Sequence, residues 1–258
     1  MAPPTAEAIK MNIQAEDNAV WDQAEARPAG LDLFEDDVAH AIADAWADVE
    51  GGLLIASVPV TGGSSAPGGP LVAGTATLSP GMLAHTASFS SINTKFSSSF
   101  PDGATEELLA LVQAIAQGIG QQFDVWVPGY SANLMGIGGS CAWVAPTPAT
   151  PSGTPGPWTG GEIQPFALAG GSSTGDQGMT ASSLDAAIGS AADPQKLKRH
   201  QNTLMPALQA LITAMAAGFA TTWTQWKSLA TISGGAGTGT SSPPNGTTVG
   251  TVASPHIG

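Results

Sequence analysis

Histidine and cysteine, which most often carry acid–base, nucleophilic or metal chemistry, are few and scattered in this chain. The four histidines show no HxH or HExxH spacing: His40, His85, His200 and His256. Cys141 is the single cysteine, which excludes an intrachain disulfide and a zinc site built from cysteines. Asp36 and His40 have the i, i+4 spacing of a metal pair, but a solvated acidic helix face explains them more simply. The sequence therefore predicts no catalytic residue, no cofactor and no metal ligand.

Other catalytic patterns are incomplete. The serine-nucleophile pattern GxSxG does not occur, because GGSCA at 138–142 lacks the final glycine. The glycine-rich stretch 62–69 has no lysine and no helix start that could hold a phosphate. The carboxylates that could be paired for glycoside hydrolysis are sequence neighbours within 32–37, whereas such enzymes place them on separate elements around a cleft. We expect a protein that is not an enzyme.

The seven tryptophans offer a second kind of site, a platform on which sugars could stack. They are Trp21, Trp46, Trp126, Trp143, Trp158, Trp223 and Trp226. Four of them recur near the ends of predicted helices, where a large apolar ring fixes the loop that follows. We therefore interpret these four as core or interface anchors and keep carbohydrate binding by tryptophan-rich loops as the alternative.

Charge excludes some partners. The net charge is −13, and residues 1–50 hold 12 of the 20 acidic side chains against two basic ones. Direct nucleic-acid binding is disfavoured, because phosphate contacts need lysine or arginine. No signal peptide and no transmembrane span is apparent, so we expect no membrane partner. Only 10% of residues are charged, which is typical of a subunit covered by neighbours.

Helical spacing of apolar residues predicts the elements that must position these side chains. We expect helices over 32–50, capped by Asp32, over 104–125, capped by Thr105 or Asp102, and over 180–192. A last helix over 194–227 should be kinked at Pro206. Three further predictions concern shorter or weaker patterns. They are a strand within 53–60, a helix carrying Phe89, Ile92, Phe96 and Phe100, and a tail over 233–258 without helical or strand period.

An internal repeat organises the chain. Residues 108–126 match residues 208–226 at an offset of 100 positions, and 38–49 is a weaker third copy. The matches include Leu111 with Leu211, Gly118 with Gly218, Phe123 with Trp223 and Trp126 with Trp226; Ile42, Trp46 and Val49 take the places of Ile119, Phe123 and Trp126. A Gly/Pro/Ser/Thr-rich segment follows each copy, over 60–80, 136–165 and 232–255. Repetition of a unit predicts a building-block protein.

These patterns predict a mainly α fold of three helix-plus-arm repeats, in which the Gly/Pro-rich arms are extended or form short β strands. The predicted divisions are an acidic N-terminal segment over 1–31 and repeats over 32–101, 102–180 and 181–258. Gly118 and Gly218 lie mid-helix, where glycine costs about 1 kcal/mol relative to alanine, so we expect them to allow close helix contact. The predicted packing and interface residues are Trp46, Gly118, Phe123, Trp126, Gly218, Trp223, Trp226, Val252 and Ile257.

The tail should dock through Val249, Val252, Pro255 and Ile257, either in a neighbouring subunit or back on the body, by adding to a strand edge. A frayed terminus is the alternative.

The pattern of 38–80, 108–165 and 208–255 resembles repeat-bearing structural proteins of tailed bacteriophage virions. The resemblance implies a non-enzymatic, oligomeric subunit of the head, neck, tail or baseplate. It implies a location in the virion, with copies of itself and other virion proteins as partners. An adhesin or carbohydrate-binding surface protein is the alternative.

Overall fold

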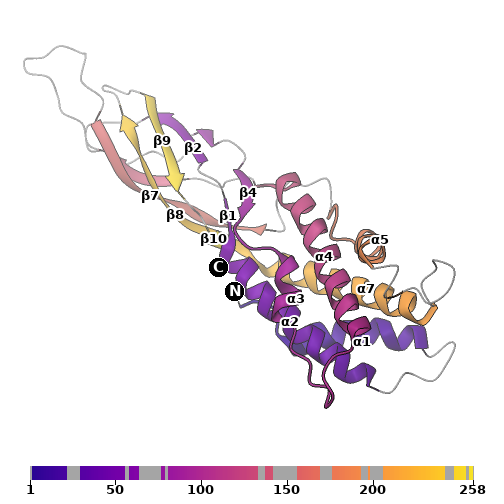
Figure 1. Ribbon diagram of the computed structural model, residues 1–258. Coiled ribbons are helices and arrows are strands. Elements are labelled where there is room, and N and C mark those ends of the chain that lie inside the picture. Colours follow the sequence, from indigo (N-terminus) through magenta and orange to yellow (C-terminus); the bar gives the residue numbers. More distant parts are fainter. Residues whose placement is uncertain are drawn as a thin grey trace, which may run out of the picture.

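A helical body and a long antiparallel sheet make up the chain, and the sheet extends away from one end of the body as an arm (Figure 1). This computed structural model describes residues 2–21, 30–55, 58–63, 77–78, 81–132, 137–141, 156–168, 176–192, 197, 206–241, 247–253 and 256–257. The two labelled ends of the chain lie close together, where the body meets the arm (Figure 1).

Three long helices form the frame of the body: α2 (Leu31–Gly52), α4 (Glu106–Gly129) and α7 (Pro206–Leu229). Each begins at a residue suited to a helix start. The Thr105 hydroxyl caps α4 by accepting from the Leu108 N–H, and Pro206 is the first residue of α7, where its missing N–H costs nothing. The expected Asp32 cap of α2 is wrong, because Gly30 in the left-handed conformation precedes this helix and Asp32 lies in its first turn.

Shorter helices lie between the long ones. They are α1 (Ala6–Trp21), the 3-10 turn η1 (Phe89–Ser91) with α3 (Ile92–Lys95), and α5 (Ala181–Ala191). In space α1 contacts α7 and α2, η1 and α3 contact α2 and α4, and α5 contacts α4 and α7. The short and long helices therefore alternate around the body, and the order closes on itself because α7 contacts α1.

Each long helix is followed, after at most one residue, by strands that run outward along the arm. The strands that come next in the sequence run inward, back toward the body. The first hairpin has β1 (Leu53–Ile55) and β2 (Val58–Gly63) outward and β3 (Thr77–Leu78) and β4 (Gly81–His85) inward. The second has β5 (Ser131–Ala132) and β6 (Ile137–Cys141) outward and β7 (Gly156–Ala167) inward. The third has β8 (Thr231–Ser241) outward and β9 (Thr247–Ala253) and β10 (His256–Ile257) inward.

The hairpins pair with one another in a cycle. The inward strand of the first hairpin, β4, pairs with β5 of the second; β7 pairs with β8 of the third; and β9 and β10 pair with β2 and β1 of the first. In each joint the second residue after a long helix faces the previous inward strand: Ser131 pairs with Met82, Thr231 with Ala167 and Leu54 with His256. The three joints therefore share one register.

The prediction of a mainly helical core is confirmed, and the Gly/Pro-rich segments do contain strands, including the expected strand near 53–60. The tail does not lack strand structure as expected, since 231–241 and 247–253 pair along most of their length. Glycine and threonine alternate there, and glycine takes the inward positions that apolar side chains fill in most strands. The alternation of apolar and polar residues that identifies a strand in a sequence is therefore missing.

One helix prediction needs correction and a second is only partly described. The helix expected through Phe100 ends at Lys95, where Phe96 turns to extended backbone, and Asp37 binds the backbone of Ser99 beyond it. The last long helix is described from Pro206 to Leu229. Residues 194–196 and 198–205, which the prediction included, lie outside the described part of the chain, so the kink expected at Pro206 stays a prediction.

Candidate interaction site in the packed body and the uncharged arm

An aromatic cluster fills the body beneath the arm. Trp46 of α2, Phe123 of α4 and Trp223 of α7 are fully buried at matching positions of the three long helices. The Trp223 ring centroid lies 5.7 Å from Trp46 and 6.0 Å from Phe123, and Trp126 approaches it edge-on at 4.8 Å. Edge and tilted contacts of this kind stabilise a pair beyond its buried area. The cluster holds the three helices together where they enter the arm.

Two glycines let the short helices touch the long ones. A Cβ built on Gly118 of α4 would lie 2.6 Å from the backbone nitrogen of Ile188 in α5. A Cβ built on Gly218 of α7 would lie 2.6 Å from the Cα of Ile13 in α1. Both distances are far below van der Waals contact, so only glycine fits at either crossing. The two predicted glycines thus occupy the same kind of contact in different helix pairs.

A buried layer joins the body to the arm. The first residue after each long helix is buried, and so is one residue of each inward strand that lies beside it. The residues of this layer are Leu53, Tyr130, Ala230, Leu83, Leu168 and Ile257. The Tyr130 hydroxyl donates to the Leu168 carbonyl, and the Leu168 N–H donates to the Ala230 carbonyl at 2.9 Å. Ile257 therefore belongs to the core of its own chain.

The arm presents an outward face of small uncharged residues. Thr159 of β7, Thr238 of β8 and Thr251 of β9 lie side by side across three strands, and all three are exposed. The alternate positions point inward, where Val60 and Val252 are fully buried. Val252 therefore packs inside the arm of its own chain. The side chains of Val249 and Pro255, which were expected to dock with it, lie outside the described residues.

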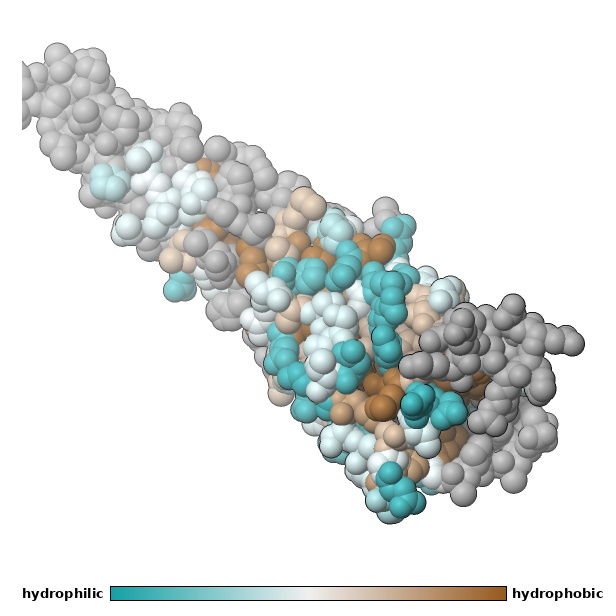
Figure 2. Space-filling model, viewed as in Figure 1, coloured by the Kyte–Doolittle hydropathy of each residue, from teal (hydrophilic) through white to brown (hydrophobic). Residues whose placement is uncertain are grey.

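Charge divides the molecule in the same way as secondary structure does. Residues 53–84 and 230–258 contain no Asp, Glu, Lys or Arg, and 131–168 contain Glu162 alone. In the view of Figure 2 the strongly hydrophilic residues gather over the helical body, whereas the described part of the arm is pale. A solvent-facing sheet with almost no charge lacks the side chains that normally block contact with other proteins. The arm is the candidate interaction site.

Lysines and acids tie the helices of the body together. Lys10 of α1 donates to Asp36 of α2 at 2.8 Å, and this hydrogen bond raises the pKa of the lysine and lowers that of the carboxyl. Lys95 of α3 lies 2.6 Å from Asp48 of α2. The Asp36–His40 pair, considered above as a possible metal site, has its carboxylate engaged by Lys10, and His40 Nδ1 lies 2.8 Å from the Asp36 carbonyl. Among the described residues no group of three His, Cys, Asp or Glu side chains could hold a metal ion.

One cluster has the composition of a catalytic triad but the wrong connections. His85 Nε2 lies 3.5 Å from Asp124 Oδ1, and the Ser88 hydroxyl donates to the same carboxylate oxygen at 3.4 Å. A nucleophilic serine needs its hydroxyl on the imidazole, which would take its proton. Here the serine is bound to the carboxylate instead, and His85 Nδ1 lies 2.9 Å from the Ala87 carbonyl. The cluster links β4 to α4.

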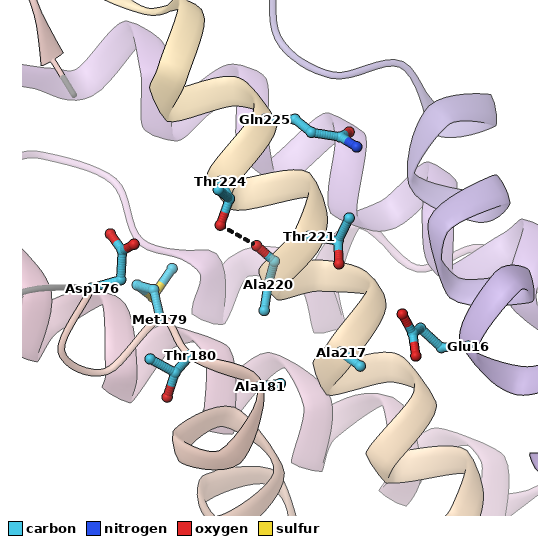
Figure 3. A pocket seen from close by; sticks show the side chains of 10 residues that line it. All are labelled: Glu16, Asp176, Met179, Thr180, Ala181, Ala217, Ala220, Thr221, Thr224 and Gln225. Atoms are coloured by element: carbon cyan, nitrogen blue, oxygen red, sulfur yellow. Dashed lines mark hydrogen bonds between the residues drawn. The ribbon is translucent and has the colours of Figure 1, made fainter.

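An open pocket of about 580 Å³ lies between α1, α7 and the start of α5 (Figure 3). Its wall on α7 is a stripe of small residues, Ala217, Ala220, Thr221 and Thr224, and the Thr224 hydroxyl donates to the Ala220 carbonyl. Glu16 and Asp176 stand on opposite sides of this stripe (Figure 3), and Asp176 pairs with Lys227. The described lining therefore offers no arranged acid–base pair.

Two of the four buried acids of the described body differ in how their charge is compensated. Asp37 accepts from the Ser99 N–H at 2.8 Å and from the Ser99 hydroxyl at 2.6 Å, so its burial is compensated. Glu50, at the end of α2, is 7% exposed, and its Oε2 has no hydrogen-bond partner in the described structure. Burial raises the pKa of the Glu50 carboxyl. The indole N–H of Trp226 is near enough to oppose this rise but not at hydrogen-bond geometry.

Most of the tryptophans considered as a platform for sugars are buried in the body. Four of its seven members are at most 3% exposed: Trp46, Trp126, Trp223 and Trp226. Buried rings cannot stack on a sugar. Trp21, Trp143 and Trp158 have side chains outside the described set.

Neither a protein-family model nor a curated protein nor a solved structure matches the chain. In the described part of the chain, every helix is too short or too polar to cross a lipid bilayer. The residues that sequence reasoning missed are Leu83, Leu168 and the threonines of the outward face. The three inward strands share one register relative to the long helices, and comparing equivalent positions on them would have identified these residues. That register is known only once the strand pairs are known.

Proposed function

We propose that the chain is a non-enzymatic structural subunit of a large assembly, a component of a tailed-phage particle. The observation that carries this proposal is the uncharged arm joined to a charged body. An exposed sheet with one charged residue on three hairpins is stable against aggregation when other proteins cover it. Head, neck, tail and baseplate are all open as its position.

Three copies of one unit would build the molecule. Each unit consists of a short helix, a long helix and a hairpin, and the units span about 6–85, 89–168 and 181–257. Leu53, Tyr130 and Ala230 stand at spacings of 77 and 100 residues, and Trp46, Phe123 and Trp223 stand at the same two spacings. The identical register of the three joints supports the same equivalence. In this division α1 belongs to the first unit instead of a separate acidic segment.

The partners would be other virion proteins, with copies of the chain as second candidates. The tail was expected to insert into a neighbouring subunit or back onto the body, and β9 and β10 pair within the chain. Strand exchange between copies is therefore unnecessary. Contacts would instead be made by the outward face of the arm.

Affinity purification of the tagged full chain from its producing cells tests this proposal. We expect it to bring down a particle, or a defined part of one, that electron microscopy can recognise as a phage structure. A chain recovered alone that binds a glycan array would favour the adhesin alternative. A chain recovered alone that binds nothing would refute the structural role.

A further inference from the structure

We propose that Glu162, on the outward face of the arm, is the contact for a lysine or arginine of the partner. The covering protein would then present an uncharged surface with one cation placed over this carboxylate. The inference rests on the proposed structural role and names the chemistry of the surface that the arm fits. It starts from the charge of the arm, in which this glutamate is the single Asp, Glu, Lys or Arg residue.

A bulge in β7 keeps this carboxylate on the outward face. Thr159 and Glu162 stand three residues apart, so the regular alternation of a strand would point one of them inward. The pairing with β8 shifts by one residue between them, because Thr159 lies beside Thr238 and Glu162 lies beside Ala236. All four side chains are exposed. The bulge therefore aims the glutamate to the same side as the threonines.

No lysine or arginine of the arm can pair with this charge. The strand neighbours of Glu162 are Gly138 in β6 and Ala236 in β8, and neither has a polar side-chain group. Residues 53–84, 131–168 and 230–258 contain no lysine and no arginine. In the free chain the exposed carboxylate is therefore stabilised by water.

The place of Glu162 in the sheet decides what a partner must provide. Because β7 pairs with β6 on one side and with β8 on the other, this residue lies inside the sheet and not at its edge. Exposed residues also flank it along the strand, Thr159 before it and Gln164 after it. A protein that covers this face therefore covers the carboxylate. Removing an ionised carboxylate from water is strongly unfavourable unless a cation and hydrogen bonds replace the water.

Another protein is a better source of that cation than a second copy of this chain. The three described lysines already have acidic partners in their own chain: Lys10 pairs with Asp36, Lys95 with Asp48 and Lys227 with Asp176. The net charge of −13 also makes two copies repel each other.

A single charge on a sheet can have a different role, which is to prevent association with other sheets. A lysine serves that role as well as a glutamate does. Pairing with a cation of the partner requires a negative charge, so the sign of the charge at position 162 separates the two roles.

Recovery of charge variants in the purified assembly tests the inference. Each tagged full-length variant is produced together with untagged wild type, and quantitative mass spectrometry measures the ratio of the two in the assembly against the ratio for tagged wild type. The variants are Glu162→Lys, Glu162→Gln and Glu162→Asp. Gln117→Lys, on the exposed side of α4, is the control for an added positive charge. Thermal unfolding of each purified variant checks that the fold is intact.

We expect Glu162→Lys to be recovered at least about tenfold less than wild type, because two cations would be buried together. Glu162→Gln should be reduced less, Glu162→Asp should be recovered better than Glu162→Gln, and Gln117→Lys should match wild type.

The inference would be overturned by wild-type recovery of Glu162→Lys or Glu162→Gln, by an equal loss for Gln117→Lys, or by Glu162→Asp recovered no better than Glu162→Gln. Each of these results would leave the structural role standing. A wild-type chain that enters no assembly would overturn both.

Discussion

Ile13 of α1 lies directly on the backbone of Gly218 in α7, so closely that a Cβ on the glycine would stand 2.6 Å from the Ile13 Cα. Ile188 of α5 lies on Gly118 of α4 in the same way. In both pairs the missing side chain allows an isoleucine to be fully buried between two helices. The contact fixes how each short helix crosses its long neighbour. It thereby sets the distance between neighbouring helices around the body.

Gly218→Ala and Gly118→Ala should each lower the free energy of unfolding by about 2 kcal/mol. The added methyl would meet backbone atoms of the facing helix, which can yield only if the two helices separate. Chemical denaturation followed by circular dichroism measures the loss.

Gly189→Ala is the matched control. Gly189 also lies in a helix, but nothing approaches its Cβ position within 4 Å. Here alanine should raise stability by roughly 0.5–1 kcal/mol, because it favours helix more than glycine does. Equal effects at all three glycines would show that the helix crossings do not depend on close approach.

The sequence predicts this part of the molecule well. Gly118 and Gly218 align at an offset of 100, and a mid-helix glycine that recurs suggests a packing role. The isoleucines that use the gap could not be found in this way. Ile13 is 205 residues from Gly218 in the sequence, and a local pattern does not say which helix faces which. Only the cyclic order of the helices brings α1 to α7.

Asp37→Asn should destabilise the protein by about 1–2 kcal/mol. The carboxylate accepts two hydrogen bonds from Ser99, and a bond to a charged group is stronger than one to an amide. Ser99→Ala removes only the hydroxyl bond and should cost less. A double-mutant cycle in urea should give a coupling energy clearly above zero, and strict additivity would show that the bond does not hold the 96–100 segment.

Glu50→Gln should stabilise the protein at neutral pH by about 1 kcal/mol, because a buried carboxylate oxygen without a partner loses its charge. Burial raises the pKa of Glu50 in the folded state, so the folded protein holds this proton more tightly than the unfolded chain. Wild-type stability therefore falls as pH rises through the unfolded-state pKa, which is about 4.3, up to the folded-state pKa.

The gain from Glu50→Gln should be full above the folded-state pKa and should vanish below about pH 4, where both states are protonated. Unfolding curves of both proteins from pH 3.5 to 8 check this. Asp102→Asn, an exposed change outside the helices, is the control for the general loss of a negative charge. A gain of the same size at every pH would show that the Glu50 carboxyl has the same pKa in the folded and unfolded states.

The strands show where reasoning from sequence stops. The repeat pointed to equivalent Gly/Pro-rich segments, and the strands of those segments do pair. Their partners could not be named, because Gly–Thr alternation carries little apolar signal and the register is set by the helices at the base of each hairpin. Trp46 and Val252 were expected to anchor packing, and both are fully buried. Whether any of the nine residues contacts another protein remains a prediction.

Val252→Asp and Thr251→Asp place the same charge on adjacent residues of β9 and should act on different properties. Val252 points into the arm and is fully buried, so an unpaired carboxylate there should cost about 3 kcal/mol or more and lower the melting temperature by several degrees. Thr251 is exposed, so its variant should melt within a degree or two of wild type. It should nevertheless enter the assembly poorly, because the charge would be buried against the partner. Thermal unfolding and the amount of each variant recovered in the purified assembly measure the two effects. A Thr251→Asp protein that assembles as well as wild type would show that this face of the arm is exposed to solvent in the assembly.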